Sequence, residues 1–386
     1  MKYNFDEIID RRNTNSIKWA VKENELPLTV ADMDFKTAPE IVEAIKTKVA
    51  TGVFGYEMPT QEYFDAVRDW YRDQHQAEIK NDWQIFVTGV VPAISSIVRR
   101  LTRPAEKIVV QTPVYNMFFH SIENNGRFVN ENKLVYDPSS HTYQIDFDDL
   151  AERLADPQTT MMILCNPQNP TGIVWSKEDL LRILELCHQN HVVLVSDEIH
   201  GGLVLSEDSY HPIFSVSEEL RNQTITLVSP SKTFNVAALH AATAIVPDPD
   251  LRYQVSRGIN NDELAEPNLA AIPGSIAAYC EGKAWLTELK GYLRANRELV
   301  KEALQTDLKG MHLVDGGATY LLWLDCSSFN KDASDLVSEI RQKTGLILAD
   351  GGVYRGNGKQ FMRMAIACPK ATLKDALERL TSVVRS

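Results

Sequence analysis

The sequence has 386 residues, which is too long for one small core and suits two domains, or one large and one small. Hydrophobic residues make up 44% and charged residues 24%, as is ordinary for a soluble globular protein. The formal net charge of −12 argues against a nucleic-acid-binding surface, because contact with a phosphate backbone requires a basic face. Any anion must therefore be bound by a local site.

The cysteines predict neither a metal site nor a disulfide framework, because no two of them lie within four residues of each other. All five stand in apolar or helical contexts, so we predict buried free thiols. The first seven residues include the acidic Asp6 and Glu7, where a signal peptide needs an apolar core, and no run of about 18 apolar residues predicts a membrane span. We therefore expect a cytoplasmic protein. The five cysteines are Cys165, Cys187, Cys280, Cys326 and Cys368.

The first 75 residues contain few regular elements. Residues 26–35 predict a short extended segment that ends in an acidic turn. Helical spacing begins at Pro39, a residue favoured at the first position of a helix. Residues 52–56 form a loop with two glycines and exposed aromatic residues, and a second helix runs from about 60 to 75 with its large apolar residues on one face.

From residue 83 to 246, apolar strands alternate with helices. Such runs, apolar without alternation, are typical of strands covered on both faces, and the βα repeat favours a mostly parallel sheet. We therefore predict an α/β fold with a large, mostly parallel sheet. The predicted strands are 83–87, 107–111, 161–165, 192–195 and 224–228.

The regular alternation of strands and helices ends at about residue 285, where a long helix begins. A strand at 319–324, a helix at 333–343 and a strand at 361–366 follow it. Thr372, with Asp375 three residues later, predicts the cap of a last helix. This part reads as a second, smaller α/β domain.

Polar side chains of distinct kinds follow the predicted strands. They are Tyr115, Asn169, Asp197, His200 and Lys232. In a parallel sheet the carboxyl ends of the strands share one edge, so these residues can converge although they are far apart in sequence. Each of these residues, taken alone, has a simpler structural interpretation; Lys232, for example, could be a solvent-exposed lysine in a loop.

Together these residue types suit pyridoxal phosphate. A lysine amine forms the imine, and an aspartate at the ring nitrogen keeps that nitrogen protonated. An asparagine can donate to the ring oxygen, with possible help from His200, and a tyrosine can stack on the ring. Serines beside Lys232 and the helix start at Gly89 can hold the phosphate, although Gly89 taken alone is more simply explained by an ordinary β-to-α turn.

The sequence resembles the cystathionine β-lyase (C–S lyase) branch of the aspartate aminotransferase-like, fold-type I pyridoxal-phosphate enzymes over essentially its whole length. The Asn-Pro-x-Asn-Pro-x-Gly motif and the Asp…Lys pair are typical of the superfamily, and the other motifs point to the lyase branch. The motifs that carry the resemblance are 5–19, 26–28, 30–35, 52–56, 89–94, 166–172, 196–200, 231–235 and 363–369.

The resemblance implies a role for each matching residue. Lys232 would be the Schiff-base lysine, Asp197 would face the pyridine nitrogen, and Asn169 the ring oxygen. The remaining cofactor contacts would come from Tyr115, stacked on the ring, and from Ser229 and the amides of Val90 and Val91 at the phosphate.

The resemblance also implies a homodimer and an amino-acid substrate. Tyr56 would reach the cofactor phosphate of the neighbouring subunit, and Arg363 would bind the substrate α-carboxylate, with Tyr56, Tyr115 and Asn169 also near the substrate. A guanidinium fork fits a carboxylate in a way that lysine would not. Considered by itself, Arg363 reads more simply as a surface arginine on a strand.

The organisation that the resemblance implies is an N-terminal segment (1–45) packing with the small domain, a large cofactor-binding domain (46–285) and a C-terminal small domain (286–386). The implied reaction is α,β-elimination from L-cystathionine or related S-substituted cysteines, giving a thiol, pyruvate and ammonia. An aminotransferase on the same fold and a cofactor-holding regulatory protein remain the alternatives.

The sequence departs from the family pattern at several positions. Family members often have Trp at the position of Thr29 and His at that of Gln168, and the Tyr354-Arg355 pair is also unusual. Residues 239–241 lack the phosphate-binding arginine of the aminotransferases, which fits the lyase branch.

Overall fold

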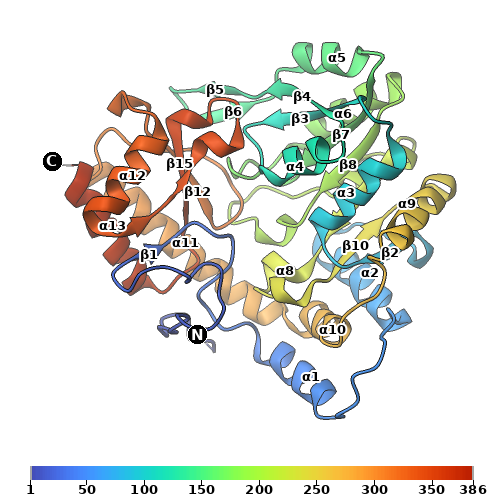
Figure 1. Cartoon of the computed structure of the whole chain (residues 1–386), viewed down its shortest axis with the longest axis horizontal. Coiled ribbons are helices and arrows are strands. Elements are labelled where there is room, and N and C mark those ends of the chain that lie inside the picture. Colours follow the sequence, from blue (N-terminus) through green and yellow to red (C-terminus); the bar gives the residue numbers. More distant parts are fainter. Residues whose placement is uncertain (1, 385–386) are drawn as a thin grey trace.

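The computed structural model describes residues 2–384, which form two sheets covered by helices (Figure 1). The larger sheet has seven strands in the order β2-β10-β9-β8-β7-β3-β4. Strand β10 runs antiparallel to both of its neighbours, and every other neighbouring pair is parallel. The predicted α/β fold with a mostly parallel sheet is therefore confirmed. The strands are β2 (Gln84–Val87), β3 (Lys107–Thr112), β4 (Phe128–Lys133), β7 (Thr159–Cys165), β8 (Val193–Asp197), β9 (Thr224–Val228) and β10 (Ala242–Ile245).

Helices cover both faces of this sheet because successive side chains of a strand point to opposite sides. In β3, Ile108 and Val110 pack into one core and Val109 packs into the other. This two-sided burial explains why the strands are apolar without alternation. On the first face lie α3 (Val90–Leu101), α4 (Met117–Glu123) and α9 (Pro249–Asn261), and on the second α5 (Phe147–Ala155) and α6 (Lys177–Gln189).

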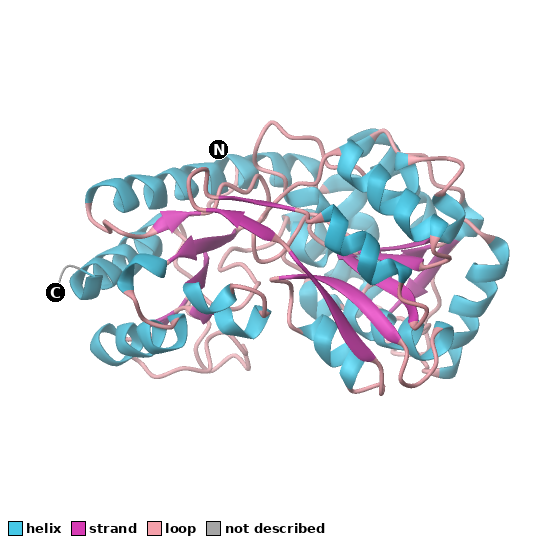
Figure 2. Cartoon of the chain, turned by 90° about the horizontal axis from the view of Figure 1, so that it is seen from above, coloured by secondary structure: helices cyan, strands magenta, loops and turns pink. Residues whose placement is uncertain are grey.

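The second sheet is antiparallel, in the order β11-β12-β15-β14, and lies at the other end of the molecule (Figure 2). Its core strand β15 is buried along its whole length. The predicted Thr372 cap is wrong: the last helix already begins at Lys370, directly after Pro369, so Thr372 lies inside it. The elements are β11 (His312–Leu313), β12 (Leu321–Asp325), β14 (Ala349–Asp350), β15 (Phe361–Ala365), α11 (Lys283–Thr306), α12 (Ala333–Thr344) and α13 (Lys370–Val384).

The N-terminal segment runs between the two sheets. Its short strand β1 (Leu26–Pro27) pairs in parallel with β13 (Leu346–Ile347), next to the second sheet. Helices α1 (Pro39–Val49) and α2 (Gln61–His75) then pack against α10 (Ala271–Glu281), beside the large sheet. The division of the chain at residues 45 and 285 stays a prediction.

Four of the five cysteines are buried as predicted, but the expectation is wrong for Cys280, which is exposed. It stands near the end of α10, where Ala277, Ala278 and Tyr279 are buried and Cys280 and Glu281 are not. Only one side of a surface helix faces a core.

Within residues 2–384, no helix combines the length and the hydropathy needed to cross a bilayer, and no group of side chains could hold a metal ion.

Candidate active site

A cavity of about 200 Å³ lies at the carboxyl edge of the parallel strands. Asp197 ends β8, Cys165 ends β7, and Lys232 lies in the short helix α8 (Pro230–Thr233) that follows β9. The strand ends thus bring together side chains that are up to 117 positions apart, from Tyr115 to Lys232. The lining residues are Ala31, Val90, Val91, Pro92, Tyr115, Cys165, Asn169, Asp197, Ile199, His200, Ser231 and Lys232.

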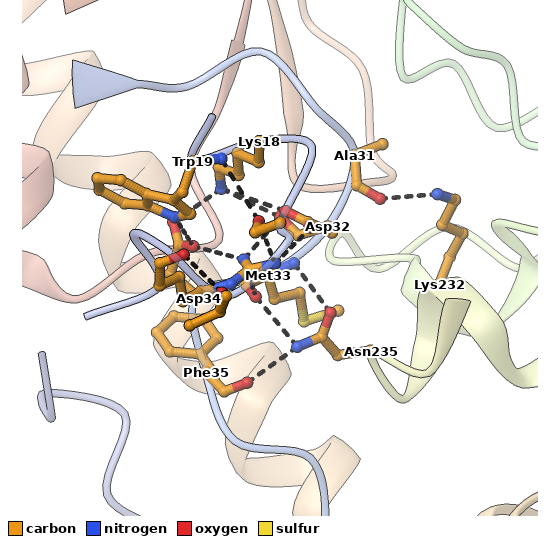
Figure 3. Close-up of polar contacts among 12 residues, drawn as sticks. Lys18, Trp19, Ala31, Asp32, Met33, Asp34, Phe35, Lys232 and Asn235 are labelled. Atoms are coloured by element: carbon orange, nitrogen blue, oxygen red, sulfur yellow. Dashed lines mark hydrogen bonds and ion pairs between the residues drawn. The ribbon is translucent and has the colours of Figure 1, made fainter. Parts of the chain in front are cut away.

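The Lys232 amine is directed toward the N-terminal segment, where it donates to the backbone carbonyl of Ala31 at 2.7 Å (Figure 3). Burial lowers the pKa of Lys232, and the positive charge of Arg363 lowers it further, against the opposing charges of Asp32 and Asp197. A lowered pKa increases the neutral fraction of the amine near pH 7. A neutral amine is the form that attacks a carbonyl or accepts a proton.

Asp197 is buried, with 4% of its surface exposed, and its Oδ1 accepts from the Ile199 backbone N–H at 3.1 Å. Burial raises its pKa to about 7, while that hydrogen bond and the charge of Lys232 act in the opposite direction. Burial disfavours the charged form of this carboxyl group, and a cation placed next to it would stabilise that form. A protonated ring nitrogen would be such a cation.

Arg363 is also buried, with 6% of its surface exposed, and it contacts the cavity through the lining residue Asn169 without lining it itself. Its guanidinium donates to Asn169 Oδ1 at 3.0 Å and to the Thr29 carbonyl at 2.7 Å, and it lies over the Tyr354 ring at 5.1 Å. The interpretation of Arg363 as a surface arginine is therefore wrong, because both faces of β15 are covered. Since Asn169 accepts through its oxygen, its amide nitrogen remains available as a donor.

Two further predicted residues line the cavity. His200 has 3% of its surface exposed, and burial, with the charges of Lys232 and Arg363, lowers its pKa to about 3, so the ring is neutral at pH 7. Burial, and next the charge of Asp197, raises the pKa of Tyr115, so its phenol stays protonated.

Of the residues predicted to bind the phosphate, Val90 and Val91 line the cavity and Ser229 does not. Val90 and Val91 open α3 after Gly89, and the first N–H groups of a helix have no acceptor within it. Ser229 does not line the cavity: its hydroxyl caps α8 by accepting from the Ser231 N–H at 3.1 Å and donates to the Ala241 carbonyl at 2.7 Å. Ser231 lines the cavity instead.

Tyr56 does not join the site of its own chain. It lies in the loop between α1 and α2 with 98% of its surface exposed, beside the exposed apolar residues Val53, Phe54 and Met58. This placement leaves the tyrosine free to reach a second subunit, which stays a prediction.

The sequence did not reveal how the N-terminal segment is held over the cavity. Lys18 is fully buried and donates to Asp34 Oδ2 at 2.7 Å (Figure 3). Arg11 pairs with Asp34 and Asp32, each at 2.7 Å. We call Arg11, Lys18, Asp32 and Asp34 the N-terminal ion cluster. The motifs 5–19 and 30–35 contain all four of these residues, but their pairing is decided by the tertiary structure.

Asn235 ties the same segment to the loop that follows Lys232. Its side chain accepts from the Met33 N–H at 3.0 Å and donates to the carbonyls of Met33 and Phe35 (Figure 3). The Ala31 carbonyl, which contacts Lys232, also accepts from the Tyr320 hydroxyl at 3.0 Å. The N-terminal segment therefore forms one wall of the cavity, supported from both sheets.

The residues present fit pyridoxal phosphate. Two buried nitrogen atoms, Nδ1 of the lining residue His200 and Nε of Arg363 behind Asn169, have no hydrogen-bond partner among residues 2–384. Buried polar atoms normally have partners, so these atoms are available to a bound group. A lysine, a buried carboxyl group, an asparagine amide and a helix N-terminus match the aldehyde, ring nitrogen, ring oxygen and phosphate of that cofactor.

This arrangement of sheet, strand ends and cavity is the fold of the pyridoxal-phosphate-dependent fold-type I enzymes. The chain belongs to the aminotransferase class I and II family, whose sequence model matches residues 23–380. Among its relatives, the cystathionine beta-lyase PatB of Bacillus subtilis is 39% identical over 99% of this chain and 100% of PatB.

Two solved structures are also similar. Cystalysin from Treponema denticola, which contains a pyridoxal 5'-phosphate cofactor, has a TM-score of 0.96 and 31% identity, over 100% of this chain and 99% of cystalysin. The pyridoxal-phosphate-bound C–S lyase from Staphylococcus hominis has a TM-score of 0.93 and 27% identity, over 100% of this chain and 98% of that one.

Proposed function

We propose that this protein is a pyridoxal-phosphate-dependent C–S β-lyase that releases a thiol, pyruvate and ammonia from an S-substituted L-cysteine. The observation that carries the proposal is the convergence of Lys232, Asp197 and Asn169 on one cavity together with the buried Arg363. The names of the relatives support the carbon–sulfur bond as the bond that breaks. L-cystathionine, which would give homocysteine, is the substrate that we favour.

Pyridoxal phosphate, when bound, supplies a ring that accepts the electron pair left on the substrate Cα. Lys232 would hold the cofactor through its aldehyde, and its amine, once free, would take the proton from the substrate Cα. Asp197 holds a proton at the ring nitrogen, and the Asn169 amide donates to the ring oxygen. Tyr115 stacks on the ring, and the amides of Val90 and Val91 bind the phosphate.

Arg363 binds the substrate α-carboxylate in this proposal. The contacts to Asn169 and to the Thr29 carbonyl leave its Nε without a partner among the residues described, so one donor is available to a ligand. Binding the carboxylate here places Cα beside Lys232. The N-terminal wall excludes water from that face, which favours proton transfer to the lysine.

We further propose that the protein is a homodimer with shared active sites and that it works in the cytoplasm. The exposed apolar side chains of Val53, Phe54, Tyr56 and Met58 form a surface that a second copy would cover. In that arrangement Tyr56 contacts the cofactor phosphate of the other subunit. The exposed apolar loop supports the dimer.

The test is pyruvate release from L-cystathionine, cystine and thioether amino acids, with and without an added keto-acid acceptor. A lyase forms pyruvate and thiol without the acceptor, whereas an aminotransferase requires it. Lys232→Ala should abolish pyruvate release and the visible absorbance of the lysine-bound cofactor, and Lys36→Ala, at an exposed lysine, should preserve both. Pyruvate formation by Lys232→Ala at the parent rate would refute the role of this lysine.

A further inference from the structure

A second cavity, of about 660 Å³, lies apart from the cofactor site and shares no lining residue with it. It is enclosed by the C-terminal end of α2, the segment 201–211 that follows β8, and the first half of α11. Its lining is mostly polar and includes three cations, Lys177, Lys290 and Arg294, and the imidazole rings of His75 and His211.

Lys290 and Arg294, the two cations on α11, lack counter-charges. They stand four positions apart on α11, so they share one face of the helix, where like charges repel. Neither forms an ion pair within residues 2–384, the Lys290 amine makes no hydrogen bond there, and Arg294 makes only a 3.5 Å contact to the Leu205 carbonyl. Burial lowers the pKa of Lys290, and Arg294 lowers it further.

His75 adds an unused polar group to the same wall. Its Nε2 is buried and has no hydrogen-bond partner among the described residues. The ring stands edge-on to Tyr210 at 4.9 Å, which fixes its orientation. Burial, followed by the charge of Lys290, lowers the pKa of His75 to about 4, so its ring is neutral at pH 7 and one of its nitrogens carries a proton to donate.

The two carboxylates of this cavity do not neutralise the cations. Glu207 and Asp208 are exposed, and neither forms an ion pair. Asp208 Oδ2 instead accepts from the Ser206 hydroxyl at 2.6 Å. A half-buried lysine without a partner, an arginine one helical turn away and an unpaired imidazole nitrogen therefore face one solvent-connected space.

We propose that this cavity is an anion-binding site, in which Lys290, Arg294 and His75 bind a small oxyanion, either a carboxylate or a phosphate group. The arginine fork suits the paired oxygens of either group, and the lysine supplies a point charge. The bound anion supplies the counter-charge and the acceptor that the two cations and the imidazole lack. The site rests on its own residues and is independent of the reaction proposed above.

The experiment is calorimetric titration of the pyridoxal-phosphate-loaded protein at constant ionic strength, with inorganic phosphate in one arm and acetate in the other. Loading fills the cofactor phosphate site, and the carboxylate site proposed at Arg363 is the same in the parent and the variants, so a difference between them reports on this cavity. We expect saturable binding of at least one anion. The affinity should fall at least tenfold in the double variant Lys290→Gln/Arg294→Gln and stay unchanged in Lys283→Gln, an exposed lysine at the start of the same helix.

A second measurement keeps the test decisive if the double variant folds poorly. Lys290→Gln removes an unneutralised half-buried charge, so in anion-free buffer it should melt at a higher temperature than the parent, and phosphate or acetate should raise its melting temperature less. Equal binding by the parent and the double variant would overturn the proposal. Absence of saturable binding of both anions by the parent would do the same.

Discussion

Replacing Lys18 with methionine would remove one partner of the buried Lys18–Asp34 ion pair while roughly keeping the side-chain volume. The Lys18 side chain is 0% exposed and that of Asp34 is 4% exposed, with 2.7 Å between Nζ and Oδ2. Removing one partner of a buried pair leaves the other charge without full compensation. We therefore expect a clear loss of stability.

The expected loss is about 3 kcal/mol, at the lower end of the range of roughly 3–5 kcal/mol for broken buried pairs. The lower end applies because Asp34 keeps the Arg11 guanidinium and the Trp19 indole N–H, each at 2.7 Å. With an unfolding entropy of about 2.1 cal/mol/K per residue, this corresponds to about 4 °C in melting temperature for a chain of this length.

Thermal unfolding of Lys18→Met and of Lys36→Met is the assay. Lys36 is a matched control because it lies in the same segment and pairs with Glu7 at 2.5 Å, but its side chain is 67% exposed. Exposed pairs contribute about 0–1 kcal/mol, so this variant should melt within about 1 °C of the parent. Equal shifts in the two variants would refute the reasoning.

The same substitution should also lower kcat/KM for pyruvate release, because the segment supplies the Thr29 carbonyl to Arg363. The decrease should be absent in Lys36→Met. A destabilised Lys18→Met enzyme with the parent kcat/KM would show that the ion cluster supports the fold and not the site.

Three further predictions concern the site and its surroundings. Arg363→Lys should lower kcat/KM about 10- to 100-fold, because one ammonium cannot replace a guanidinium that already serves two acceptors. Burial raises the pKa of Glu198 to about 7 from an ordinary 4.5, so the folded state keeps a proton that the unfolded chain loses. Its contribution to stability therefore falls between about pH 4.5 and 7, and Glu198→Gln should flatten the denaturant-measured dependence on pH. Mixing inactive Lys232→Ala and Tyr56→Ala chains should restore about a quarter of the parent activity, since about half of the dimers pair unlike chains and each of these has one intact site.

For each of these three predictions, one result would contradict the reasoning. An Arg363→Lys enzyme with the parent kcat/KM would remove this residue from substrate binding. An unchanged slope of stability against pH in Glu198→Gln would show that this carboxyl group does not titrate in that window. Mixed chains that exchange subunits and stay inactive would contradict an active site shared through Tyr56.

Local patterns determined most of the architecture and the identity of the central residues. Apolar runs predicted the strands because two-sided burial removes polar alternation, as β3 and β9 show. The position of Asn169, Asp197 and Lys232 after such strands was enough to expect one site, because parallel strands end at one edge. These are properties of sequence order and strand direction, and no long-range side-chain contact is needed to infer them.

The tertiary structure decided what depends on contacts between distant segments. Whether Arg363 was exposed or buried depended on which strands and loops cover β15, and whether the Ser229 hydroxyl was free depended on the Ala241 carbonyl. The burial of Lys18 is a further case, because its partner Asp34 and the loop at Asn235 come together only in the folded chain. A hydrogen bond between residues 200 positions apart leaves no periodic signal in the sequence, since it is set by packing and not by local conformation.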